Sequence, residues 1–165
     1  MADEDDALAG DGRDETEAER LDRNWDEILQ ETRVVQTGTQ ILTGFLLAIA
    51  FQQRFEDLDG YQIAVYLVLV CFAVLATLLA LTPVSMHRAL FRRRAKKRLV
   101  ATGNLLLIAT LAAVLLTLSG TALLIFDMVA GHPAGFLAGG IVLVLGFAAW
   151  YLLPGLARIR MRRQR

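Results

Sequence analysis

The chain has 165 residues, 55% of them hydrophobic, and its 17 acidic and 17 basic residues give a formal net charge of zero. This apolar fraction is higher than that of an ordinary soluble domain and argues against one. The zero conceals a separation, because residues 1–33 hold thirteen acids and four bases, whereas residues 34–165 hold four acids and thirteen bases. The composition therefore predicts an acidic N-terminal segment attached to a basic, membrane-embedded region.

The N-terminal segment divides into a tail and a short helix. Residues 1–19 are acidic and poor in apolar side chains, so we expect a disordered tail. From Leu21 onward, apolar residues recur at helical spacing, which predicts a short amphipathic entry helix. This helix either runs into the first membrane span or lies along the inner membrane surface. Docking of its acidic residues Glu27 and Glu31 on the basic second loop is a hypothesis.

Four segments are long and apolar enough to cross a bilayer, whose hydrocarbon core of about 30 Å needs about 20 helical residues. They cover approximately residues 34–52, 61–82, 100–126 and 134–154, and the last three contain no charged residue. The remaining polar sequence is too short to bury three such segments. The sequence therefore predicts an all-α, four-helix transmembrane bundle with up-down-up-down order, formed by residues 20–165.

Basic residues in the flanks of the spans give the orientation, because lysine and arginine concentrate on the cytoplasmic side. With both termini inside, sixteen of the 17 basic residues lie inside, and Arg54 alone lies outside. The opposite orientation would reverse this count. We therefore expect a multi-pass protein of the cell membrane with both termini in the cytoplasm.

The first span is the most polar of the four. Arg33, Gln36, Gln40, Thr43 and Gly44 share one helical face, and Glu31 and Arg33 lie at the inner boundary. One interpretation is a polar path or ligand site, since polar side chains in lipid are costly. The alternative is hydrogen bonding between helices by the two glutamines, with Gly44 and Ala48 allowing close approach.

The outer ends of the third and fourth spans carry two further candidates. Asp127 either binds a proton or cation at an external mouth or is a solvated helix end, and we favour the second interpretation. Gly135 and Gly139 form a GxxxG motif, which is typical of closely packed helix pairs and of oligomers. A second copy of the chain or another membrane protein is thus open as a partner.

Residues for catalysis or for metal binding are not grouped in the sequence. His87 and His132 fall on opposite sides of the membrane, and the chain has one cysteine, so we expect no metal site. We also find no phosphate-binding loop, nucleophile elbow or paired intramembrane carboxylates, and we expect neither an enzyme nor a cofactor. The run RRRAKKR between two spans fixes topology and suits anionic lipid headgroups rather than nucleic acid.

One part of the sequence resembles a known family. The stretches are ETRVVQTGTQILTGFLLAIAFQQRFEDLDG, QIAVYLVLV and TPVSMHRALFRRR, between Glu31 and about Phe91. They resemble a family of small four-span proteins of unknown function from high-GC Gram-positive bacteria. Some members carry the label sodium:proton antiporter. The resemblance implies no catalytic or binding residues.

Two functions follow as expectations. The first is a non-enzymatic accessory or structural protein of the cell membrane, which fits the charge-free spans. The alternative is a small sodium:proton antiporter or other ion transporter. Coupled exchange normally requires a buried ionisable group near the middle of the membrane. The first span has neutral Gln40 at the corresponding depth, so the residues favour the accessory role.

Overall fold

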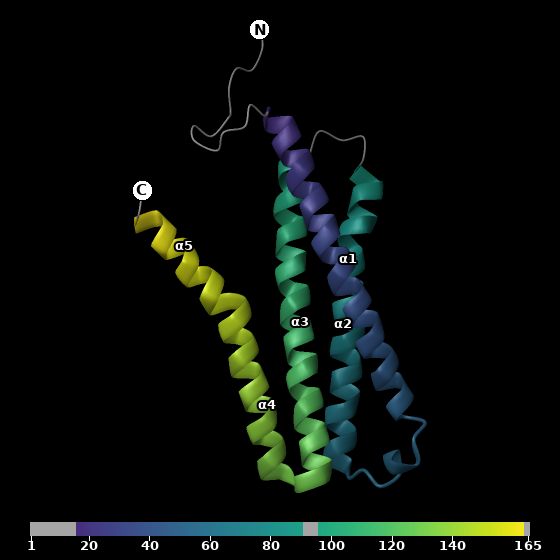
Figure 1. Cartoon of the computed structure of the whole chain (residues 1–165). Coiled ribbons are helices and arrows are strands. Elements are labelled where there is room, and N and C mark those ends of the chain that lie inside the picture. Colours follow the sequence, from purple (N-terminus) through teal and green to yellow (C-terminus); the bar gives the residue numbers. More distant parts are fainter. Residues whose placement is uncertain (1–15, 91–95, 164–165) are drawn as a thin grey trace.

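Four long helices make up the protein in a computed structural model that describes residues 16–90 and 96–163 (Figure 1). The fourth helix is built from three consecutive segments. Residues 1–15 of the predicted tail, 1–19, and residues 91–95 of the basic second loop, on which docking was a hypothesis, lie outside the described residues. The elements are α1 (Glu17–Ile49), η1 (Gln53–Phe55), α2 (Gly60–Leu90), α3 (Lys96–Ala130), α4 (His132–Phe147), η2 (Ala148–Leu152) and α5 (Leu153–Arg163).

The first helix begins earlier than expected and has no break. The Thr16 hydroxyl accepts a hydrogen bond from the Glu19 backbone N–H, and the Glu19 carboxylate accepts one from the Thr16 backbone N–H. This capping box satisfies two backbone donors and starts the helix at Glu17, inside the segment that composition assigned to the tail. The Thr16 backbone N–H and the Thr16 hydroxyl both donate to the Glu19 carboxylate, and these two bonds hold the pKa of Glu19 below its ordinary value. The entry helix and the first predicted span are therefore one helix of 33 residues.

Three of the long helices are apolar and long enough to cross a membrane. Their candidate spans are Gly60–Met86, Leu99–Ala130 and His132–Leu156, which contain or closely match the predicted spans two to four. Among the described helices, α1 does not meet this test, because its first half is rich in charged residues and the neutral polar residues Gln36 and Gln40 lower the hydropathy of its second half. The protein is accordingly a multi-pass helical membrane protein. For α1, composition alone does not indicate a membrane span.

The helices continue through two prolines. Pro83 lies within α2, which runs on to Leu90. Pro154 follows the π-helical segment η2, in which the Leu153 N–H bonds to the Ala148 carbonyl five residues earlier. Proline lacks the N–H that would bond to the carbonyl four residues back, so a wider turn at this place is the expected response.

Two ends of the bundle are distinguished by their connections (Figure 1). At the end we call the hairpin end lie residues 50–59, between α1 and α2, and Gly131, between α3 and α4. At the other end, the basic end, lie the start of α1, the end of α5 and the ends of α2 and α3 that flank residues 91–95. Gly131 has a φ of 85°, a left-handed conformation that glycine adopts without strain.

Helix α1 packs along both α2 and α3. Near the hairpin end, Leu46 is buried with Tyr66 of α2 and Leu124 of α3, and the Tyr66 hydroxyl donates to the Leu46 carbonyl over 2.9 Å. Near the basic end, Trp25 and Ile28 are buried, and a Cβ at Gly103 of α3 would lie 2.8 Å from Trp25 Cζ3. The apolar face of the predicted entry helix thus covers the start of α3.

The α4–η2–α5 helix is the least buried of the three candidate spans. It packs on α3 and inclines away from the other helices toward its C-terminal end (Figure 1). Large apolar side chains on it are exposed, among them Phe136, Leu137 and Val144. A membrane supplies the apolar solvent that such a surface requires.

Candidate functional site

A buried carboxylate lies at the hairpin end of the bundle. Asp127 is 4% exposed, because α3 continues past it to Ala130 and directs the side chain toward α2 and α4. Our expectation of a solvated helix end was therefore wrong. An ionised carboxylate is costly to bury, so its hydrogen-bond partners decide what the site can do.

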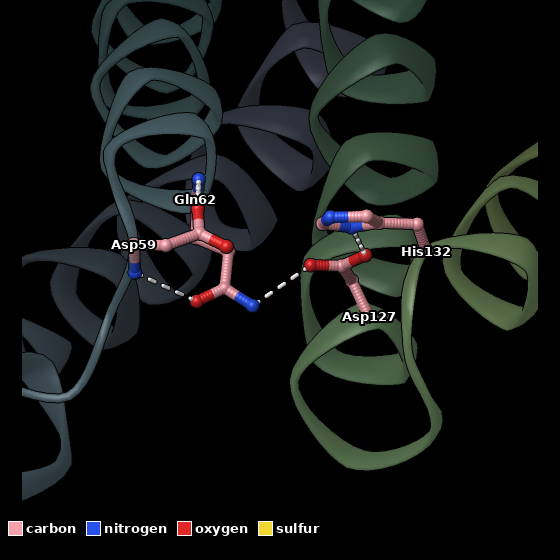
Figure 2. Close-up of polar contacts among 4 residues, drawn as sticks. All are labelled: Asp59, Gln62, Asp127 and His132. Atoms are coloured by element: carbon pink, nitrogen blue, oxygen red, sulfur yellow. Dashed lines mark hydrogen bonds and ion pairs between the residues drawn. The ribbon is translucent and has the colours of Figure 1, made fainter.

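Both carboxylate oxygens of Asp127 have a side-chain partner (Figure 2). The Gln62 amide Nε2 of α2 donates to Oδ2 over 2.8 Å. The His132 Nδ1, in the first turn of α4, bonds to Oδ1. Asp127 therefore joins α3 to both neighbouring helices. We call Asp59, Gln62, Asp127 and His132 the Asp127 cluster.

Gln62 is held in a fixed orientation by the start of α2. The Gln62 backbone N–H donates to Asp59 Oδ1 over 2.8 Å, and the Asp59 backbone N–H donates to Gln62 Oε1 over 3.1 Å. This reciprocal pair satisfies donors at the start of the helix. Because Oε1 accepts, the amide nitrogen is the atom that faces Asp127. The start of α2 therefore presents a donor to the carboxylate.

His132 connects the cluster to the surface. Its side chain is 57% exposed, whereas that of Asp127 is 1% exposed. The ring of Tyr61 lies edge-on to the His132 ring, with the centroids 5.2 Å apart. With Asp127 as acceptor, Nδ1 carries the proton, and Nε2 makes no hydrogen bond to a described residue. The arrangement can tie three helices together and can exchange a proton with water through the imidazole.

The structure does not bring a metal-ligand set or a catalytic set together at this cluster. In the described part of the chain, no three histidine, cysteine, aspartate or glutamate side chains are grouped closely enough to hold a metal ion. His132 has an acidic partner, but no serine or cysteine nucleophile is bonded to it. The cluster therefore supports helix attachment or proton binding.

The predicted polar face of the first span is divided between two environments. Gln36 and Thr43 turn toward α2, and the Thr43 hydroxyl lies 3.5 Å from both the Ala73 carbonyl and the Thr77 hydroxyl. Gln40, Gly44 and Ala48 are exposed instead. A Cβ at Gly44 would meet no atom within 4 Å, so Gly44 does not lie against another described helix. The face does not form one continuous polar path among the described residues.

Glu31 and Arg33 lie near the middle of α1, and Arg33 is beside the basic end of α2, away from the Asp127 cluster. Both are exposed. Arg33 and Gln36 line a pocket between α1 and α2 that also includes Thr32 and Arg88. The sequence grouped these candidates with Asp127 as polar membrane residues, and the structure places them apart from it.

Gly135 and Gly139 lie against α3. A Cβ at Gly135 would be 2.8 Å from the Leu123 carbonyl oxygen and 2.8 Å from Asp127 Cβ. A Cβ at Gly139 would be 2.9 Å from Leu123 Cβ. Both glycines are buried, and they allow α4 to approach the backbone of α3. This contact also brings His132 within reach of Asp127.

Comparison with known proteins identifies a family for the chain. A family of unknown function, DUF6328, matches residues 14–154. The chain belongs to this family. No curated protein and no solved structure matches the chain. The match spans α1 to α4 and all four residues of the Asp127 cluster, and it agrees with the resemblance to a family of unknown function. The bacterial group and the antiporter label stay expectations.

The pairing of Asp127 with His132 was missed in the sequence. The two residues are five positions apart across Gly131, and the glycine at a helix end was the available indication of a turn. The contact with Gln62, 65 positions earlier, has no local sequence pattern. It depends on α2 and α3 lying side by side.

Proposed function

We propose that this DUF6328 protein is a four-span protein of the cell membrane with both termini in the cytoplasm. We further propose that it acts there as a non-enzymatic accessory or structural component. The observation that carries the accessory role is the Asp127 cluster, in which the buried carboxylate is used for attachment between helices. Contact with anionic headgroups at the basic end and with another copy or membrane protein belongs to the same proposal.

The packing of α1 supports a fourth span. Trp25 contacts the start of the α3 span, and Leu46 contacts Tyr66 near the other end of the α2 span. The 21 residue steps from Trp25 to Leu46 correspond to roughly 32 Å at 1.5 Å per residue, so α1 lies beside the other spans over about the thickness of a bilayer. Its charge-free part, residues 34–49, corresponds to roughly 24 Å and covers most of the hydrocarbon thickness of about 30 Å. In this arrangement Glu31 and Arg33 lie at the inner boundary.

The distribution of basic residues supports the orientation. The hairpin end has Arg54, and the remaining lysines and arginines belong to the basic end or to the segments adjoining it. Tags fused to the two termini test both statements. Four spans with both termini in the cytoplasm predict that both tags are protected from protease in intact cells. Two accessible tags would reverse the orientation, and one protected with one accessible tag would indicate three spans.

Bonding at Asp127 supports attachment over ion transport. Its two oxygens accept from Gln62 and His132, so an incoming cation would have to displace partners from α2 and α4. The cluster also lies at the hairpin end rather than in the middle of the spans. Because Gln62 is itself fixed by Asp59, the site is organised for a stable contact.

Ion exchange is the second candidate, and one observation favours it. A buried carboxylate next to a solvent-exposed histidine is a group that protons can reach from one side. An antiporter also requires access to the same group from the basic end. Along this route the described helices carry threonines, such as Thr110 and Thr117, whose hydroxyls donate to backbone carbonyls of their own helix. These residues do not supply further carboxylates for proton transfer.

Proton flux in liposomes tests the two candidates. The purified protein is reconstituted, and flux is recorded under sodium and potassium gradients for the wild type, Asp127→Asn, Glu31→Gln and the control Glu56→Gln, an exposed loop residue. The accessory role predicts no cation-driven flux in any of them. Sodium-driven flux that Asp127→Asn abolishes and Glu56→Gln retains would establish the antiporter and overturn our proposal.

A further inference from the structure

A pocket lies between the middle of α1 and the basic end of α2. It has a volume of about 170 Å³ and is lined by Leu29, Thr32, Arg33, Gln36, Val84 and Arg88. We call it the Thr32 pocket. Its polar lining consists of hydrogen-bond donors: two guanidinium groups, an amide and a hydroxyl. No acidic side chain belongs to this lining.

The Thr32 hydroxyl is a buried donor without a partner. Thr32 is 2% exposed, and its Oγ1 makes no hydrogen bond. Hydroxyls of other helical threonines donate to a backbone carbonyl about one turn earlier, as at Thr37, Thr43, Thr77, Thr82, Thr110, Thr117 and Thr121. Thr32 departs from this pattern although it lies in the middle of α1. A buried hydroxyl left unbonded destabilises the protein, so a ligand that accepts from it gains affinity.

The two guanidinium groups come from different helices. Arg33 extends from α1 and Arg88 from α2, and both are exposed. Neither side chain forms a hydrogen bond or an ion pair with another residue in the ranges 16–90 and 96–163. The nearest acid in sequence, Glu31, is exposed and is not part of the lining. The positive charge of the pocket is therefore not neutralised by the described chain.

We propose that the Thr32 pocket binds a phosphate group. Phosphate offers several acceptor oxygens and negative charge, and guanidinium groups bind it with paired hydrogen bonds. The two sources of this chemistry are the headgroup of an anionic phospholipid and soluble phosphate. Leu29 and Val84 supply the apolar part of the lining, which a lipid uses and inorganic phosphate does not. The lipid source depends on the proposed membrane orientation, but binding of phosphate to the pocket does not.

Binding is measured with the full chain in a neutral detergent. The probes are phosphatidylglycerol, diacylglycerol and inorganic phosphate, and native mass spectrometry and thermal melting report occupancy. We expect phosphatidylglycerol to bind and to raise the melting temperature. Stabilisation by inorganic phosphate alone would identify a soluble source, and the pocket would stand. Equal effects of phosphatidylglycerol and diacylglycerol, which has the same acyl chains but no phosphate, would show that the phosphate is irrelevant and would overturn the proposal.

Three variants locate the binding. Removing one charge-assisted bond by Arg33→Gln or Arg88→Gln lowers affinity by about tenfold or more. Arg160→Gln is the matched control, because Arg160 is exposed at the basic end but is not part of the pocket. Thr32→Val removes the hydroxyl, keeps the shape and weakens binding severalfold. A loss of affinity in Arg160→Gln equal to that in Arg33→Gln would indicate unspecific attraction and contradict the pocket.

This result is independent of the flux experiment. Cation-driven flux in liposomes would overturn the accessory role and leave the phosphate pocket intact. Unchanged lipid affinity in Arg33→Gln, Arg88→Gln and Thr32→Val would remove the pocket and leave the accessory role intact.

Discussion

The hairpin end and the basic end differ in whether their buried polar groups have hydrogen-bond partners. At the hairpin end, both oxygens of Asp127 are bonded, and the Gln62 amide bonds both to Asp59, just before α2, and to Asp127 of α3. At the basic end, the Thr32 hydroxyl has no partner, and the guanidinium groups beside it have none among the described residues. Polar groups whose hydrogen bonds are all formed stabilise one arrangement of the helices. A buried polar group without a partner costs free energy, and a ligand that bonds to it recovers that free energy as affinity. The comparison points to attachment at the hairpin end and to binding at the basic end.

The largest expected effect concerns the contact that brings α4 to the hairpin end. Gly135→Ala places a Cβ against the Leu123 carbonyl and Asp127, and we expect a loss of about 3 kcal/mol in the free energy of unfolding. Gly140→Ala is the control, because its Cβ would meet no atom within 4 Å. The measurement is unfolding in mixed detergent micelles followed by circular dichroism. Equal stability of the two variants would mean that α4 does not pack on α3 in this way.

The next effect tests whether the Asp127 cluster is a tie between helices. Gln62→Leu leaves Asp127 Oδ2 buried without a donor and removes the acceptor of the Asp59 N–H, so it should cost about 2 kcal/mol. The matched control is Gln53→Leu, at an exposed position of η1. The same micelle unfolding reports both variants. If Gln62→Leu were as stable as Gln53→Leu, the hairpin end would not be more tightly bonded than the basic end.

A gain in stability is expected at the basic end. Thr32→Val removes the unbonded hydroxyl at nearly constant volume, and without lipid it should stabilise the chain by about 1 kcal/mol. Thr117→Val is the control, because the buried Thr117 hydroxyl donates to the Ala113 carbonyl over 2.8 Å. We expect no gain there. Destabilisation by Thr32→Val in lipid-free detergent would show that the hydroxyl has a partner within the chain.

The smallest effect concerns the first turn of α1. Thr16→Ala removes the cap and should cost about 0.5 kcal/mol. Because the cap lowers the pKa of Glu19, its stabilisation is present at neutral pH and is lost as the pH falls through that lowered pKa. Thr16→Ala should therefore raise the pKa of Glu19, measured by NMR titration of labelled carboxyl groups. Thr37→Ala, farther along the same helix, should leave it unchanged.

Much of the fold was predictable, because each helix carries its own indication. The candidate spans Gly60–Met86, Leu99–Ala130 and His132–Leu156 follow from uninterrupted apolar sequence, which hydrophobic burial in lipid makes decisive. Glycines at 135 and 139 indicated a close contact, although only the structure identifies α3 as the partner. The sequence prediction placed the start of α1 too late, because it assigned residues 1–19 to a disordered tail from their acidic composition and did not use the cap formed by Thr16 and Glu19.

The sites were less predictable, because they depend on neighbours that are distant in sequence. The sequence favoured a solvated helix end at Asp127, whereas in the structure α2 and α4 cover this side chain. Thr32 looked like any other helical threonine, and only packing against α2 leaves its hydroxyl buried and unbonded. The sequence by itself determined that this is a membrane protein with an acidic and a basic region, because hydropathy and charge are properties of each residue and do not depend on its neighbours in space. The tertiary structure decided which polar groups are paired, since hydrogen bonds require two atoms to meet in space.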